Sequence, residues 1–208
     1  DRVFSAETGY ADTLGKFYGG GLLMRDFDDH RFQRRIFQSA FKNDAMRDYT
    51  DMMNPIMEAN IRSWKGNTDF KFFNNVKETL LDAAATIFLG IEDFKGEEAK
   101  KMSKTFVTIA DGMLGVLRYD TPLLPFGKWR KGMVAKRYME AFLGSQIEKR
   151  RASDGKDMFT FMCKEKRPDT GEYFSNEDII AHINFLLFAA HDTTASNLTY
   201  IMQHLGQN

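Results

Sequence analysis

Residues 185–205 read FLLFAAHDTTASNLTYIMQHL, and their apolar side chains recur at the three- and four-residue steps of an α-helix. Three short polar residues, Asp192, Thr193 and Thr194, interrupt this pattern at its centre. Such residues are unfavourable inside a helix, because their side chains compete for the backbone's hydrogen bonds and are costly to bury without partners. The stretch therefore predicts either a functional site or a helix boundary at this point.

A capping box marks where this helix begins. Ser175 is followed three residues later by Asp178, so each side chain can bond to the backbone amide of the other, and we expect the helix to begin at Asn176. Neither proline nor glycine follows before Leu205, which predicts a rod of about 45 Å that can cross a whole domain. Its stripes are largely apolar, so we expect it to be buried, with a C-terminal cap within residues 205–208.

The remaining sequence predicts an all-α fold. Helical spacing of apolar residues recurs between short polar, glycine- or proline-containing breaks, and strand alternation is almost absent. The further predicted helices cover residues 30–41, 45–64, 72–89, 97–115 and 127–151. The 19 Phe and 12 Met fit either an adaptable apolar cavity or a Phe-rich core.

Composition narrows the class of protein. The 29 basic and 29 acidic residues balance to a net charge of zero, which argues against a nucleic-acid binder. The longest apolar run, residues 183–190, is too short to cross a bilayer, and the N-terminal DRVFSAET lacks the layout of a signal peptide. We therefore expect a cytoplasmic or cytoplasm-facing location. The chain lacks an initiator Met, so we expect it to be an excerpt of a longer protein.

The central Asp-Thr-Thr group has two interpretations from its spacing alone. Asp and Thr are preferred N-caps, so Asp192 or Thr193 can begin a second helix. Alternatively, a buried acid beside a hydroxyl in an apolar wall can relay protons to a reacting atom, and burial would raise the pKa of that acid. The spacing leaves both interpretations open.

A resemblance favours the second interpretation. The sequence AAHDTT at residues 189–194 resembles the oxygen-binding motif of the cytochrome P450 central helix, which is small-Gly-x-acid-Thr-Thr. It implies that the Thr193 hydroxyl stabilises iron-bound dioxygen and that Asp192 supplies protons to it. Ala190 departs from the family's usual glycine. The further haem contacts that the resemblance implies are Ala189, Ala190 and Thr194.

A second motif lies far upstream. The sequence DDHRFQRRIFQSAF at residues 28–41 resembles the P450 segment in which a His or Trp, followed four residues later by Arg, contacts the haem propionates. His30 and Arg34 share one helix face, so they can clamp paired carboxylates with charge-assisted hydrogen bonds. By itself the pattern also fits a solvated basic face. We expect Arg31 and Arg35 to face solvent, on the side where an acidic electron donor docks.

The segments 97–115 and 127–151 occupy the position of the two helices that roof the substrate cavity in that family, so the resemblance covers essentially the whole chain. Residues 1–208 are thus expected to be a partial P450-like helical domain, truncated at both ends, with a long central helix. The basic cluster Lys128–Arg137 fits a solvated helix face, and contact with a membrane surface is left open. The candidate roof residues, which also fit the core, are Phe106, Ile109, Ala110 and Met113.

In that family a Glu-x-x-Arg helix and the haem-binding cysteine loop lie C-terminal of the oxygen-binding helix, so we expect both to lie beyond Asn208. The single cysteine, Cys163, precedes the central helix and lacks the glycine and aromatic residues of that loop, so we expect a core thiol. The resemblance therefore implies a haem cofactor whose axial cysteine lies outside this chain.

Two classes of function remain. The first is the distal half of a haem-thiolate monooxygenase that uses dioxygen, and electrons from a ferredoxin, flavodoxin or reductase, to oxidise a small apolar substrate; without the cysteine we expect this chain alone to be inactive. The second is a non-catalytic helical binding domain derived from such an enzyme. A metal site in a helical bundle lacks the necessary Glu-x-x-His or His-x-x-x-His spacing, so no protein metal ligands are predicted among His30, His182, His191 and His204.

Overall fold

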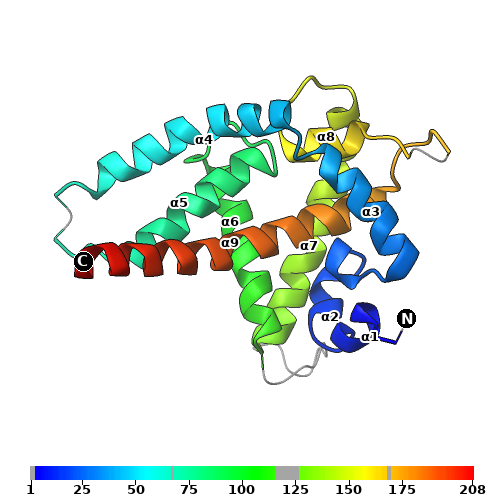
Figure 1. Ribbon diagram of the computed structural model, residues 1–208, viewed down its shortest axis with the longest axis horizontal. Coiled ribbons are helices and arrows are strands. Elements are labelled where there is room, and N and C mark those ends of the chain that lie inside the picture. Colours follow the sequence, from blue (N-terminus) through cyan, green and yellow to red (C-terminus); the bar gives the residue numbers. More distant parts are fainter. Residues whose placement is uncertain (1–2, 67, 116–126, 168–169) are drawn as a thin grey trace.

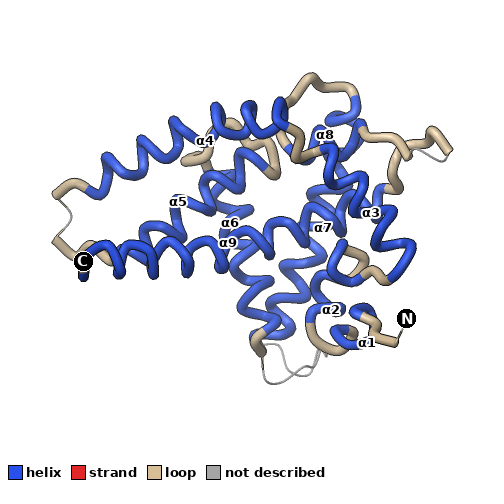
Figure 2. The backbone as a smooth tube through the Cα atoms, in the orientation of Figure 1, coloured by secondary structure: helices blue, strands red, loops and turns tan. Residues whose placement is uncertain are grey.

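The computed structural model describes residues 3–66, 68–115, 127–167 and 170–208. This part of the chain is built of helices and loops, with one isolated β-bridge between Lys166 and Tyr173, and the all-α prediction is confirmed (Figure 2). The elements are α1 (Ala6–Tyr10), α2 (Leu14–Tyr18), the 3-10 helix η1 (Leu22–Met24), α3 (Phe27–Ser39), α4 (Asn43–Trp64), α5 (Phe72–Ile87), α6 (Glu97–Met113), α7 (Lys128–Arg151), α8 (Met158–Lys164) and α9 (Asn176–Gln207).

The long helix α9 begins where the sequence predicts. The Ser175 hydroxyl accepts a 3.0 Å hydrogen bond from the backbone amide of Asp178. The helix then continues without interruption past Asp192, which excludes a helix restart there. The predicted C-terminal cap within residues 205–208 is confirmed, because α9 ends at Gln207 and the side-chain amide of Asn208 donates to the carbonyl of His204 at 3.0 Å.

Helix α9 crosses the whole molecule, and only part of it is buried. In Figure 1, α6 and α7 cross α9 near its middle, and α2, α3 and α8 lie towards its N-terminal end. Its buried residues run from Ile179 to Ala195, whereas Leu198, Tyr200 and Ile201 are exposed. The prediction of complete burial is therefore wrong, because one side of α9 is exposed from Ala189 onward and no residue after Ala195 is buried.

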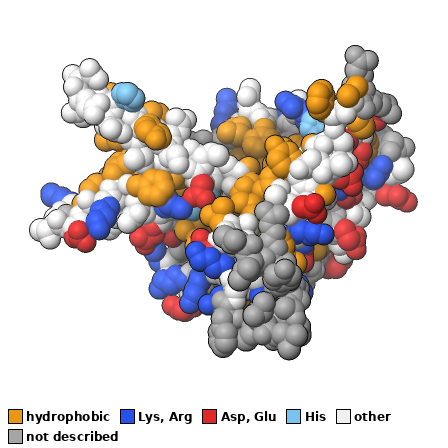
Figure 3. All heavy atoms as spheres, turned by 90° about the horizontal axis from the view of Figure 1, so that it is seen from below, with side chains coloured by type: hydrophobic (Ala, Val, Ile, Leu, Met, Phe, Trp, Pro, Cys, Tyr) orange, Lys and Arg blue, Asp and Glu red, His pale blue; other side chains and the backbone are white. Residues whose placement is uncertain are grey.

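Hydrophobic side chains are correspondingly visible on the surface. Figure 3 shows them in a band that runs from the protruding end of the molecule into the centre of the face seen from below. The protruding end holds the C-terminal turns of α9 and the connection between α4 and α5 (Figure 1). The large apolar residues exposed near this end include Ile61, Phe70, Phe73, Leu198, Tyr200, Ile201, Met202 and Leu205.

Helices α6 and α7 form a close-packed antiparallel pair around two glycines. A Cβ added to Gly132 would lie 2.7 Å from the Cα of Gly112 and 2.9 Å from the Phe17 ring. The ring of Trp129, one turn before Gly132, packs edge-on against Phe17 with their centroids 4.8 Å apart. Trp129 is thus core, which corrects its assignment to an exposed basic cluster.

Of the four candidate roof residues, Phe106 and Ile109 are buried in the core, whereas Ala110 and Met113 are half-buried. Residues 116–126 of the connection between α6 and α7, with its two prolines, lie outside the described residues.

Replacement of Gly132 by Ala should lower the free energy of unfolding by about 1–3 kcal/mol, because the added methyl overlaps backbone atoms of α6. Urea denaturation of the 208-residue chain measures this loss. Gly9→Ala is the matched control, because its Cβ would meet nothing within 4 Å. Equal stability of the two variants would contradict the close approach of the helices.

Candidate functional site

The AAHDTT motif presents its polar residues at the surface. Asp192, Thr193 and Thr194 are exposed, as is Ala189, whereas Ala190 is half-buried. His191, which lies between Ala190 and Asp192 in the motif, is buried instead. The acid and both hydroxyls therefore lie on the open side of α9, beside small alanine side chains.

Asp192 is not the buried acid that the functional interpretation expected. Its carboxylate is 56% exposed and lies 2.6 Å from the Lys77 ammonium group of α5. Because a 100° step per residue places Asp192 next to the buried stripe of α9, its side chain reaches the rim where α5 packs. The acid is thus held by a cation at the surface. Lys77 is a site residue that sequence reasoning missed, since nothing in a local pattern pairs α5 with α9.

The Thr193 hydroxyl is bonded within its own helix. It donates to the Ala189 carbonyl at 2.7 Å, which is a common way for threonine to satisfy its hydroxyl inside a helix. The hydroxyl oxygen keeps lone pairs with which it can accept a hydrogen bond. Thr193 is therefore an exposed hydroxyl with a fixed donor bond and capacity to accept from another group.

His191, between Ala190 and the acid, is a core residue. It is 3% exposed and packs edge-on against Phe106 of α6, with their ring centroids 5.4 Å apart. Neither ring nitrogen makes a hydrogen bond, although Nδ1 lies 3.4 Å from the Asp192 carboxylate. Burial is the main cause that lowers the pKa of His191, so the neutral ring is favoured in the fold.

The second predicted motif lies on α3. His30 is half-buried and Arg34 is exposed, and the two lie one turn apart at the edge of the buried face formed by Gln33 and Phe37. The side chain of Arg34 makes no hydrogen bond or ion pair to the described residues. Their orientation towards residues 189–193 stays a prediction.

The prediction that Arg31 and Arg35 face solvent is confirmed. Arg31 forms an ion pair with Asp28 at 3.1 Å, and the Arg35 guanidinium donates to the Arg31 carbonyl at 3.4 Å. These two arginines thus lie on the face of α3 opposite to its buried side.

A buried polar contact fixes α3 against α9. The Nε2 of His182 lies 2.9 Å from the amide oxygen of Gln33, and the Phe37 ring packs edge-on against the imidazole with centroids 4.6 Å apart. His182 precedes Thr193 by roughly 16 Å along the helix axis, at 1.5 Å per residue. The two motifs are therefore connected through α9, but α3 meets that helix well before the acid and the hydroxyls.

Cys163 lies inside the core, as expected from its sequence context. It belongs to α8 and is fully buried. Burial raises the pKa of its thiol to about 12, so the thiolate that binds a metal is disfavoured. Its position gives it no part in the candidate site.

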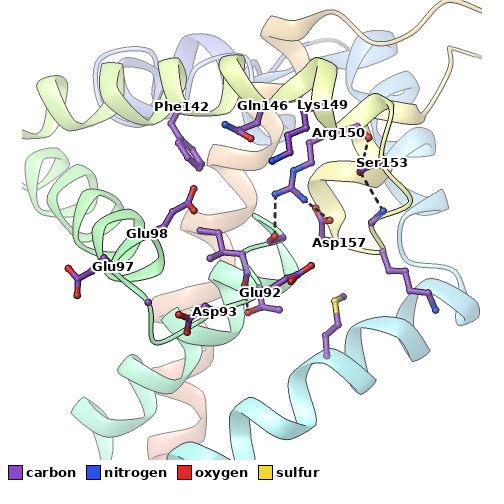
Figure 4. Close-up of a pocket in the computed structure, with 17 residues that line it drawn as sticks. Glu92, Asp93, Glu97, Glu98, Phe142, Gln146, Lys149, Arg150, Ser153 and Asp157 are labelled. Atoms are coloured by element: carbon purple, nitrogen blue, oxygen red, sulfur yellow. Dashed lines mark hydrogen bonds and ion pairs between the residues drawn. The ribbon is translucent and has the colours of Figure 1, made fainter.

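A separate cleft lies away from these residues. Its volume is about 700 Å³, and it lies between the connection of α5 to α6 and the C-terminal half of α7. Figure 4 shows Lys149 pointing into it. At one end Arg150 forms a 2.9 Å ion pair with the buried Asp157 and donates to the Leu89 carbonyl at 2.6 Å. These bonds join the end of α5 to α7 and α8. None of the predicted site residues lines this cleft.

The all-α fold and the unbroken central helix α9 define a helical class of protein that can be compared with known families. Comparison with known families matches residues 2–208 to the family described as Cytochrome P450. The chain belongs to the cytochrome P450 family.

Individual relatives support this. The Putative cytochrome P450 136 of Mycobacterium tuberculosis is 32% identical over 203 residues, which cover 96% of this chain and 40% of that protein. The Cyclooctat-9-en-7-ol 5-monooxygenase of Streptomyces melanosporofaciens is 27% identical over 217 residues, covering 99% and 45%. This chain thus spans less than half the length of these relatives.

Solved structures show the same fold. The structure titled Retinoic acid bound cyanobacterial CYP120A1 superposes with a TM-score of 0.81 at 22% identity, over 94% of this chain and 44% of the other. The cytochrome P450DA heme domain gives a TM-score of 0.78 at 20% identity, over 98% and 46%. Among the described helices, none is both long and apolar enough to cross a membrane.

Acidification should weaken the contact between α3 and α9. Burial is the main cause that lowers the pKa of His182 from 6.5 to about 4, so the unfolded chain takes up its proton first as the pH falls. The free energy of unfolding should therefore fall by about 3 kcal/mol between pH 6.5 and 4 through this group. Urea denaturation at pH 7, 5.5 and 4 measures it. A His182→Gln variant should show a flatter dependence, and an unchanged slope would contradict the assignment.

Proposed function

We propose that this chain is the distal half of a haem-thiolate monooxygenase that activates dioxygen to oxidise a small apolar substrate. The observation that carries the proposal is the exposed pair of Asp192 and Thr193 on an unbroken α9, next to the small side chain of Ala189. The small side chain leaves room for a reacting group, and the acid and the hydroxyl beside it can supply protons to that group.

The donors on α3 fit the haem that the family implies. Arg34 is exposed and forms no ion pair within the described residues, and half-buried His30 lies one turn away. Together they can donate to two carboxylates from one face. When bound, haem supplies the redox chemistry of oxygen activation. Ala189, Ala190 and Thr194 would line it on the side of α9.

The side chains of this chain would then manage protons and orientation. Asp192 exchanges protons with solvent at the rim of α9, where Lys77 holds its carboxylate. The Thr193 hydroxyl, fixed by its bond to the Ala189 carbonyl, accepts a hydrogen bond on the open side. Asp192 and Thr193 would therefore pass protons from solvent to a group bound on the open side of α9.

The remaining parts of the reaction lie outside these residues. Buried Cys163 does not fit an axial ligand, so we place that cysteine outside residues 1–208 and expect this chain alone to have no monooxygenase activity. Exposed Arg31 and Arg35 would meet an acidic ferredoxin, flavodoxin or reductase. The names of relatives, among them Cyclooctat-9-en-7-ol 5-monooxygenase, support a small organic substrate.

The alternative of a non-catalytic binding domain would be favoured if the chain covered the open side of α9 with its own side chains. Thr193 and Asn197 are exposed instead, and Ala190 is half-buried. This arrangement favours the monooxygenase.

Arg34→Ala should weaken haem retention, because one of the two propionate donors is lost. The measurement is the rate at which haem passes from the longer protein, with its axial ligand, to an acceptor such as apomyoglobin. Arg35→Ala is the matched control on the opposite face of the same helix. Equal rates for the two variants would show that Arg34 does not bind the propionates.

Thr193→Ala should leave substrate binding nearly intact but divert reducing equivalents into hydrogen peroxide, because the hydroxyl that directs protons is removed. The ratio of product formed to NAD(P)H consumed, measured together with peroxide, tests this in the longer protein. Thr199→Ala is the control, since Thr199 makes the same type of bond to the Ala195 carbonyl farther along α9. Unchanged coupling in Thr193→Ala would argue against the proposed function.

A further inference from the structure

The hydroxyl of Tyr18 is buried and has no hydrogen-bond partner. The residue is 3% exposed, and its ring stacks on Phe188 with centroids 4.4 Å apart and planes inclined by 26°. A phenylalanine would make the same stack without the cost of burying an unpaired hydroxyl. Packing therefore does not explain why this ring carries an oxygen.

The stack on Phe188 places the Tyr18 ring one helical turn before the acid of the candidate site on α9. Phe188 precedes Asp192 by one helical turn, so the two side chains leave neighbouring points on the same flank of α9. Burial and, second, the negative charge of Asp192 raise the pKa of the Tyr18 phenol. The phenol thus lies within the electrostatic reach of the carboxylate.

The present partner of Asp192 holds it loosely. The Lys77 and Asp192 side chains are 32% and 56% exposed, and exposed ion pairs contribute little because water screens them. A carboxylate in such a pair can change rotamer at low cost. Hydrogen bonds to charged groups, by contrast, are stronger than those between neutral ones.

We propose that Tyr18 is a positioning residue for Asp192, whose carboxylate accepts a hydrogen bond from the Tyr18 hydroxyl when it turns away from Lys77. The acid, which also lies 3.4 Å from the Nδ1 of His191, then exchanges a cation at the surface for a phenol in the interior. This inference rests on the proposed function, in which Asp192 acts as a proton donor, and it adds a residue that positions this acid. The hydroxyl selects the inward position of the acid.

A mutant cycle on the 208-residue chain tests the exchange of partners. In the wild-type background, Tyr18→Phe should leave the unfolding equilibrium constant unchanged or lower it, because an unpaired buried hydroxyl is removed. In a Lys77→Met background, the same substitution should raise that constant by about threefold to tenfold, because the bond to Asp192 is lost. Urea denaturation measures all four proteins.

Nuclear magnetic resonance supplies a signature that a merely structural tyrosine would lack. A slowly exchanging phenolic proton should appear in Lys77→Met and vanish when Asp192→Ala or Tyr18→Phe is added. Tyr49→Phe is the matched control, because its buried hydroxyl already contacts the Met158 sulfur at 3.6 Å and should respond equally in both backgrounds.

Equal effects of Tyr18→Phe in the two backgrounds, or no such proton, would overturn the proposal. Neither measurement needs haem, so failure here leaves the proposed function standing. Failure of the Thr193→Ala test would conversely leave this hydrogen bond intact.

Discussion

One-sided burial of α9 is the constraint on which the rest of the structure depends. Its buried residues, from Ile179 to Ala195, form the surface against which the neighbouring helices pack. Because the other side stays open, polar residues at the centre of the helix carry no penalty for burial. The Asp-Thr-Thr group that looks misplaced in the sequence is thus accommodated by its position around the helix axis.

Much of the fold follows from local sequence patterns. The six long helices were predictable because each repeats its apolar spacing over several turns, and the Ser175 cap located the start of α9. Helices α1, α2 and α8 are too short to show such a repeat. The burial of α9 was overestimated because apolar spacing reports which side of a helix favours burial, whereas actual burial depends on what packs there.

The site itself was predicted only in part. The acid, the hydroxyls and the His-Arg pair stand in short motifs, so the sequence could propose them. Lys77 joins Asp192, and Gln33 joins His182, through contacts between helices far apart in the chain. No local period encodes such a pair, because each requires a relative placement of two helices that only the packed core determines.

Polar groups buried along α9 show a division of roles. The contact between His182 and Gln33 satisfies one ring nitrogen and fixes α3, so the polar pair contributes specificity to the packing. The Tyr18 hydroxyl and both nitrogens of His191 are buried and make no hydrogen bond, although the Nδ1 of His191 lies 3.4 Å from the Asp192 carboxylate. Buried groups without hydrogen bonds reduce stability compared with apolar side chains of similar shape. His191 directly precedes Asp192, and Tyr18 stacks on Phe188, which lies one helical turn before Asp192. Unpaired polar groups gathered around one acid are hard to explain by packing, and they become intelligible if the surroundings of that acid rearrange as it works.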